Sequence, residues 1–149
     1  MKPNIQAVAL RLLARREHSA QELRRKLGDK GFTAGEVENV LERLAQDKLL
    51  SDERFVESFI QSRINKGYGP LHIQAELYER GISRGLIDAL IQTGAAQWSE
   101  LAVRAQHKRF GQGLPADYKE YARQARFLQQ RGFTMEQINS ALKQAHDAS

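Results

Sequence analysis

Apolar side chains recur every three or four residues along most of the chain, in short stripes separated by polar turns. Val37, Val40, Leu41 and Leu44, for example, fall on one face of a helix, and the same period returns in the other segments. The alternating pattern of a half-buried strand does not stand out anywhere. We therefore predict an all-α protein whose stripes, together with Trp98 and the phenylalanines, form the core.

One turn occurs three times, as Gly31-Phe32-Thr33, Gly81-Ile82-Ser83 and Gly132-Phe133-Thr134, at spacings of 50 and then 51 residues. Glycine ends a helix in the left-handed conformation, and the Ser or Thr that follows caps the next helix. A Glu or Gln three residues after the cap completes a capping box in the first and third copies, whereas the second copy has Leu86 there. Such regular spacing indicates an internal repeat.

An additional amphipathic segment precedes each of these helix pairs, so each repeat has three helices. We expect repeats at residues 1–48, 49–93 and 94–149. A unit of roughly 45 residues is marginal alone, but stacking lets each copy bury surface against its neighbour. The predicted architecture is an elongated, curved array of three tandem three-helix repeats.

The sequence offers no recognisable catalytic or metal site. It has no cysteine, and the four histidines, His18, His72, His107 and His146, stand apart without metal-ligand spacing. We expect each histidine at the surface. Phosphate-binding loops and nucleophile elbows are missing too. The prediction is a protein that is not an enzyme and uses no cofactor or metal.

No segment of the sequence reads as a membrane span, and the first residues lack the apolar run of a secretory signal. We therefore expect a cytoplasmic protein, without a membrane partner.

Charge is segregated along the chain, beyond the net value of +5. Residues 4–31 carry seven basic and three acidic side chains, whereas residues 33–47 carry one basic and four acidic. Residues 104–131 carry seven basic and two acidic. A basic surface of this kind suits a phosphate backbone or an acidic protein groove, and charge alone does not separate the two.

The candidate contact residues lie in three basic segments. They comprise the cations of the first repeat, the turn around residue 68, and the cations of the third repeat: Arg24, Arg25, Lys26, Arg63, Lys66, Tyr68, Lys108, Arg109, Arg123, Arg126 and Arg131.

Four blocks in order, 19–27 (SAQELRRKL), 50–55 (LSDERF), 63–70 (RINKGYGP) and 131–133 (RGF), resemble the signature of RecX, the bacterial regulator of the RecA recombinase. The resemblance covers nearly the whole chain. It implies binding to RecA in the groove of its filament on DNA, with inhibition of filament growth, ATP hydrolysis, strand exchange and repressor cleavage. DNA repair and the SOS response would be modulated in consequence. Asp52 and Arg54 match the family pattern, but a helix-start acid and an internal ion pair explain them equally well.

Two other functions remain open on the residues alone. One is a DNA-binding protein that acts by occupying single- or double-stranded DNA without sequence preference, and its binding should fall steeply with salt. The other is a helical-repeat adaptor for an unrelated acidic partner. A monomer is expected in each case.

Overall fold

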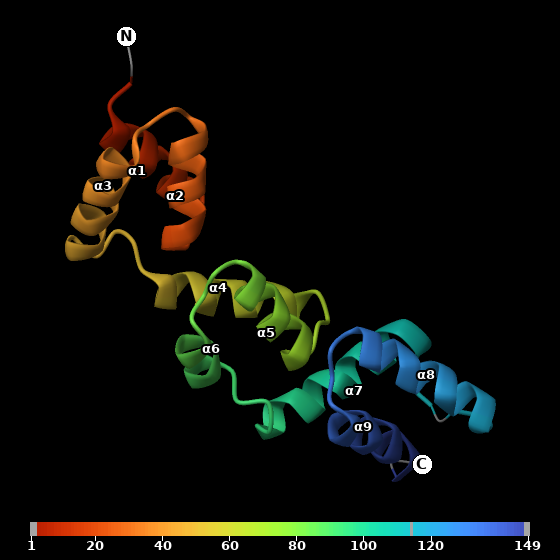
Figure 1. Cartoon of the computed structure of the whole chain (residues 1–149). Helices are drawn as coiled ribbons and strands as arrows, with labels where there is room; N and C mark the ends of the chain where they lie inside the picture. The colour runs from red at the N-terminus through yellow and green to blue at the C-terminus, as the bar shows by residue number, and fades with distance from the viewer. Residues whose placement is uncertain (1–2, 114, 148–149) are drawn as a thin grey trace.

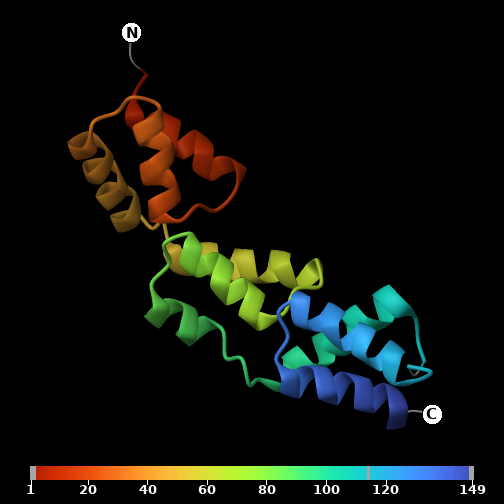
Figure 2. The same ribbon diagram turned by 45° about the vertical axis from the view of Figure 1, so that its right-hand side comes forward.

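The structure is a computed structural model that describes residues 3–113 and 115–147. Within these ranges the regular secondary structure is entirely helical, which confirms the predicted class. The helices follow one another as three groups of three, and Figures 1 and 2 show the groups in a row from the N-terminus to the C-terminus. In chain order they are α1 Ile5–Arg15, α2 Ala20–Asp29, α3 Ala34–Gln46, α4 Asp52–Asn65, α5 Pro70–Glu79, α6 Arg84–Leu90, α7 Ala96–Phe110, α8 Tyr118–Gln130 and α9 Met135–Asp147.

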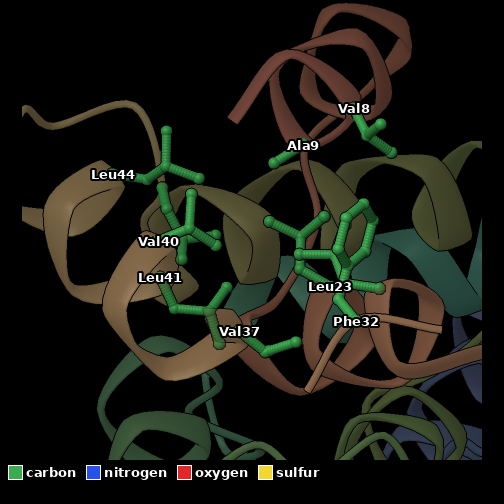
Figure 3. Close-up of a cluster of buried hydrophobic side chains, with 10 residues drawn as sticks. Val8, Ala9, Leu23, Phe32, Val37, Val40, Leu41 and Leu44 are labelled. Carbon is green, nitrogen blue, oxygen red and sulfur yellow. The ribbon is translucent and has the colours of Figure 1, made fainter. Parts of the chain in front are cut away.

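Each group of helices encloses its own apolar core. In the first, Ala9 of α1, Leu23 of α2 and Leu44 of α3 are fully buried (Figure 3). Trp98 departs from the sequence pattern: it lies in α7 yet packs into the second core, where its indole N–H donates to the carbonyl of Gln92 at 3.1 Å. Leu101 of α7 contacts both the second and the third core. Helix α7 thus ties the last two groups together.

The repeated turn has the predicted geometry in all three copies. Gly31, Gly81 and Gly132 have φ of 94°, 84° and 98°. The residue after each glycine donates its backbone N–H to the carbonyl of the leucine five positions earlier, at 3.1 to 3.3 Å, and its side chain is buried. This is the bond pattern of a Schellman helix end.

The helix caps also follow the sequence. Ser19, Thr33 and Thr134 each accept from the backbone N–H three residues later, and the Glu or Gln at that position accepts in return. Ser83 caps α6 through the N–H of Leu86 alone. Local chemistry therefore sets where these helices begin.

A first joint connects the first two groups through side chains. The carboxylate of Asp52, at the start of α4, accepts from the backbone N–H of Ala20 at the start of α2, at 2.8 Å. Arg54 pairs with Glu17 at 3.1 Å, and Arg80 lies 3.6 Å from Glu22. Asp52 and Arg54 thus have structural roles between the repeats.

A second joint connects the last two groups through the backbone. The N–H groups of Gly69 and Leu71, at the start of α5, donate to the carbonyls of Arg131 and Gly132 at 2.7 and 2.9 Å. A Cβ on Gly69 would lie 2.6 Å from the carbonyl carbon of Gly132, and a Cβ on Gly132 would lie 2.4 Å from the Cβ of His72. Only glycine permits this approach. In both joints, backbone N–H groups at the start of the second helix of one group donate to acceptors in the following group.

Candidate functional site

The predicted contact residues of the first repeat lie on α2 and are differently engaged. Arg24 forms an ion pair with Glu38 of α3. Arg25 is exposed, has no ion pair among the described residues, and lines a charged groove of about 510 Å³ between α2 and α5. Lys26 is half-buried, with its Nζ 2.9 Å from Nε2 of His18. Arg25 is therefore the side chain of this set best placed to meet a partner.

The prediction that every histidine lies at the surface is wrong for His18, which is only 1% exposed. Its Nδ1 lies 3.0 Å from the carbonyl of Arg16. Lysine only donates, so Nε2 must accept from Lys26 and Nδ1–H must donate to Arg16. Burial lowers the pKa of His18, and the charges of Arg16 and Lys26 lower it further. The ring is thus a neutral connector inside the first repeat.

His72 and His107 are half-buried, and the side chain of His146 lies outside the described residues. Within the described part of the chain, no three His, Asp or Glu side chains gather as metal ligands would. Over the same residues, no helix is both long and apolar enough to cross a membrane.

Glu22 concentrates charge beside His18. Its carboxylate accepts from two guanidinium nitrogens of Arg16, at 3.2 and 2.9 Å, and from the backbone N–H of Ser19. Burial disfavours ionisation of this carboxyl, but these hydrogen bonds outweigh burial and lower the pKa of Glu22. Glu22 therefore stays ionised. Its carboxylate completes the capping box of α2 and also lies near Arg80 in the first joint.

Arg63, predicted as a contact residue, is occupied within the fold. It forms two hydrogen bonds to the carboxylate of Glu76, at 2.9 and 3.1 Å, and its guanidinium lies 4.3 Å from the centre of the Phe59 ring. Only 18% of its side chain is exposed. Bidentate pairing of this kind fixes α4 against α5.

The turn before α5 brings Tyr68 into a stack. The Tyr68 and His72 rings are nearly parallel, with centroids 4.3 Å apart. The guanidinium of Arg131, from the third repeat, lies 4.8 Å from the Tyr68 ring, and an Arg131 N–H donates to the carbonyl of Lys66 at 3.4 Å. Lys66 itself is exposed. The structure thus joins two of the predicted segments.

From Arg131 the contacts continue along the third repeat. Arg131 lies 5.2 Å from the Phe127 ring, which meets the Phe110 ring edge to face at 5.3 Å. Arg109 lies 5.5 Å from Phe110 and 5.9 Å from Phe127, and Arg123 lies 5.3 Å from Phe110. We call this set the arginine–aromatic ladder, comprising Tyr68, Arg131, Phe127, Arg109, Phe110 and Arg123. Each contact is of the cation–π or aromatic kind.

A cleft of about 420 Å³ opens at the Tyr68 end of the ladder. Its lining comes from the end of α4, the turn before α5, α7 and the turn before α9: Ile64, Asn65, Gly67, Tyr68, Leu101, Arg104, Ala105, Lys108 and Phe133. Lys108 and Arg104 are exposed at α7, and Arg126 is exposed on α8; none of them has an ion pair among the described residues. These exposed cations, which lack an ion pair in the described part of the chain, thus lie in the same region as the aromatic side chains of the ladder.

Sequence reasoning predicted Tyr68 as a contact residue but missed the two phenylalanine rings of the ladder. Phe110 and Phe127 were expected in the core but are only half-buried. Each follows an arginine directly, as Arg109-Phe110 and Arg126-Phe127, and that dipeptide was the available signal. Their edge-to-face meeting depends on how α7 packs against α8.

Comparison with known proteins places this architecture in one family. Models of the first, second and third three-helix domains of RecX match residues 7–44, 51–91 and 96–142. The chain is 45% identical over 143 residues to the regulatory protein RecX of Halorhodospira halophila, covering 96% of this chain and 89% of that protein. It is 42% identical to the RecX of Pseudomonas putida W619, covering 93% and 88%.

Two solved structures share the fold. The crystal structure of RecX from Lactobacillus salivarius superposes with a TM-score of 0.79 at 18% identity, covering 95% of this chain and 94% of that one. A second crystal structure of regulatory protein RecX gives a TM-score of 0.74 at 21% identity, covering 92% and 71%. The predicted resemblance is confirmed: the chain belongs to the RecX family of regulatory proteins.

Proposed function

We propose that this protein regulates the RecA recombinase by lying along the groove of the RecA filament on DNA. One observation carries the proposal: three separately cored helical groups stand in a row (Figure 1). A row of units can touch several subunits of a helical polymer at once, so modest contacts add up to firm binding. Membership of a family of regulatory proteins supports the same function.

The action needs no chemistry by the regulator itself. An array seated across neighbouring recombinase subunits restricts the movements that accompany ATP hydrolysis, and it obstructs strand exchange, repressor cleavage and filament growth. The protein is accordingly a non-enzymatic inhibitor that modulates DNA repair and the SOS response. It works in the cytoplasm as a monomer.

The exposed cations supply attraction and orientation. Arg25 on α2 and Arg126 on α8 are exposed and without ion pairs among the described residues, so their charge is available to an acidic groove. Rim charges of this kind act mainly on association rate and register.

Co-sedimentation with RecA filaments on single-stranded DNA tests this binding. The protein should pellet with filaments at a salt concentration where it stays in solution with DNA alone. Arg25→Glu with Arg126→Glu should weaken filament binding about tenfold. The matched control, Arg11→Glu with Arg43→Glu, makes the same charge change at exposed positions of α1 and α3 and should have little effect. Equal pelleting with bare DNA, or equal loss in both variants, would contradict the proposal.

A further inference from the structure

A pocket of about 310 Å³ lies at the first joint and shares no lining residue with the arginine–aromatic ladder. Three guanidinium groups line it, from Arg16 directly after α1, Arg63 in the last turn of α4 and Arg80 directly after α5. Ser58 and Ser62 line it too, and they lie one turn apart on exposed positions of α4. The pocket is therefore rich in hydrogen-bond donors that come from both the first and the second group.

Two of these guanidinium groups are held in place by one aromatic ring. Arg63 lies 4.3 Å and Arg80 lies 4.9 Å from the centre of the Phe59 ring. Arg80 approaches Glu22 only to 3.6 Å, and its guanidinium has no hydrogen bond among the described residues. A guanidinium that rests on a ring keeps its charge and its N–H donors, and it loses less rotamer freedom when it binds an anion.

The charges around the pocket leave Arg80 in excess. Arg16 pairs with Glu22 and Arg54 pairs with Glu17, each through a hydrogen-bonded ion pair. Arg63 likewise donates to Glu76 through Nε and Nη2, and its Nη1 has no hydrogen bond among the described residues. Four arginines thus face three glutamates: Arg16, Arg54, Arg63 and Arg80 against Glu17, Glu22 and Glu76.

This balance favours a compact anion over a long one. The unpaired donors of Arg80 and Arg63 and the hydroxyl groups on α4 match the oxygens of a phosphate group, which accepts several hydrogen bonds at once. The surrounding carboxylates would repel the further charges of an extended polyanion. A single phosphate group can be received where a chain of phosphates is disfavoured.

We infer that the pocket at the first joint binds one phosphate group, from free phosphate or pyrophosphate or from the end of a nucleotide. Arg80, Ser58 and Ser62 of the second group donate to its oxygens, and Arg16 adds positive charge from the first group. A bound phosphate thus connects the first two groups and stiffens the joint between them. The site goes beyond the proposed regulation of RecA, because it takes a small ligand and needs no recombinase.

Isothermal titration calorimetry at constant ionic strength, without DNA or RecA, tests the inference. The full chain is titrated with phosphate, pyrophosphate, ADP and adenosine. Arg80→Gln is compared with Arg84→Gln, which removes the same charge from an exposed arginine that also lies on a ring, 5.7 Å from the centre of Tyr78. Ser58→Ala with Ser62→Ala removes the hydroxyls and keeps the charge. Thermal melts followed by circular dichroism verify that all variants are folded.

Pyrophosphate should bind the unaltered protein with a Kd of about 1 mM, and Arg80→Gln should weaken this binding about tenfold. The serine variant should lose about threefold, and Arg84→Gln should stay within about twofold because salt screens a distant charge. Pyrophosphate should also raise the melting temperature of the unaltered protein, and this rise should be much smaller in Arg80→Gln.

The nucleotide identifies the source of the phosphate. Equal affinity for ADP and pyrophosphate would assign the site to the free anion, whereas tighter binding of ADP would assign it to a nucleotide, and both support the inference. No binding of pyrophosphate at about 20 mM, equal losses in Arg80→Gln and Arg84→Gln, or adenosine binding as tightly as ADP would each overturn it. Because RecA is left out, these results are independent of the filament-binding test.

Discussion

The two joints between repeats occupy equivalent places in the array but are built from different chemistry. At the first, the start of α2 meets the following group through Asp52, Arg54 and Arg80, all by charged side chains. At the second, the start of α5 meets the following group through backbone hydrogen bonds and two facing glycines. Helix α7 also shares its apolar side chains between the second and third cores.

This difference separates a fixed part of the array from an adjustable one. Backbone contacts tolerate little displacement, so the second and third groups form one body. Side-chain ion pairs can lengthen, reform and be screened by salt. The first group can therefore change its angle relative to the other two, while the ladder and its cleft keep their shape.

The largest effect is expected from breaking the second joint with Gly132→Ala. A Cβ there would meet the backbone N of His72 at 2.5 Å, in addition to adopting a strained φ of 98°. We expect a loss of about 3 kcal/mol in the free energy of unfolding, measured by denaturant titration. Gly31→Ala is the control, because its φ is 94° but nothing lies within 4 Å of the added Cβ. Its loss should be about 1 kcal/mol, and equal losses would refute the packing role.

Breaking the first joint with Glu22→Gln should cost less. The substitution removes the negative charge that pairs with Arg16 and lies near Arg80. We expect a loss of about 2 kcal/mol in the free energy of unfolding. Glu17→Gln removes a second carboxylate of this joint, whose partner Arg54 is 43% exposed, and should cost under about 1 kcal/mol. A larger loss for Glu17→Gln than for Glu22→Gln would contradict the expectation that the more buried carboxylate contributes more to the free energy of unfolding.

The smallest effect concerns pH and the first repeat. Because the pKa of His18 is lowered in the folded protein from the ordinary 6.5, the unfolded chain binds more protons as pH falls below 6.5. Stability should be complete above that value and decrease below it, by at most about 1.4 kcal/mol per pH unit. Denaturant titrations at several pH values should show this slope in the unaltered protein and a reduced slope in His18→Gln. An unchanged slope would assign the effect to other groups.

Features set by neighbouring residues were predictable from the sequence. The three glycine turns, their Ser and Thr caps and the helical stripes each depend on residues within a few positions, and all appear in the structure. The all-α row of repeats follows from their regular spacing.

Features that depend on how helices and turns pack together were not predictable. His18 lies beside Lys26 and Glu22 because of the path of the chain between α1 and α2. No pattern in the sequence predicted that His18 is buried. The sequence predicted Arg63 as a contact residue, but in the structure its guanidinium donates to the carboxylate of Glu76. The ladder requires Arg131 to reach across the second joint to Tyr68, a contact that spans two repeats.

Regulation of RecA is tested most directly by ATP hydrolysis of preformed RecA filaments on single-stranded DNA. The protein is added well below the RecA concentration, beside a salt-matched DNA-binding control. We predict that hydrolysis falls under conditions where the protein barely binds bare DNA. Hydrolysis that is unaffected, or that falls only once the protein coats the DNA, would contradict the account.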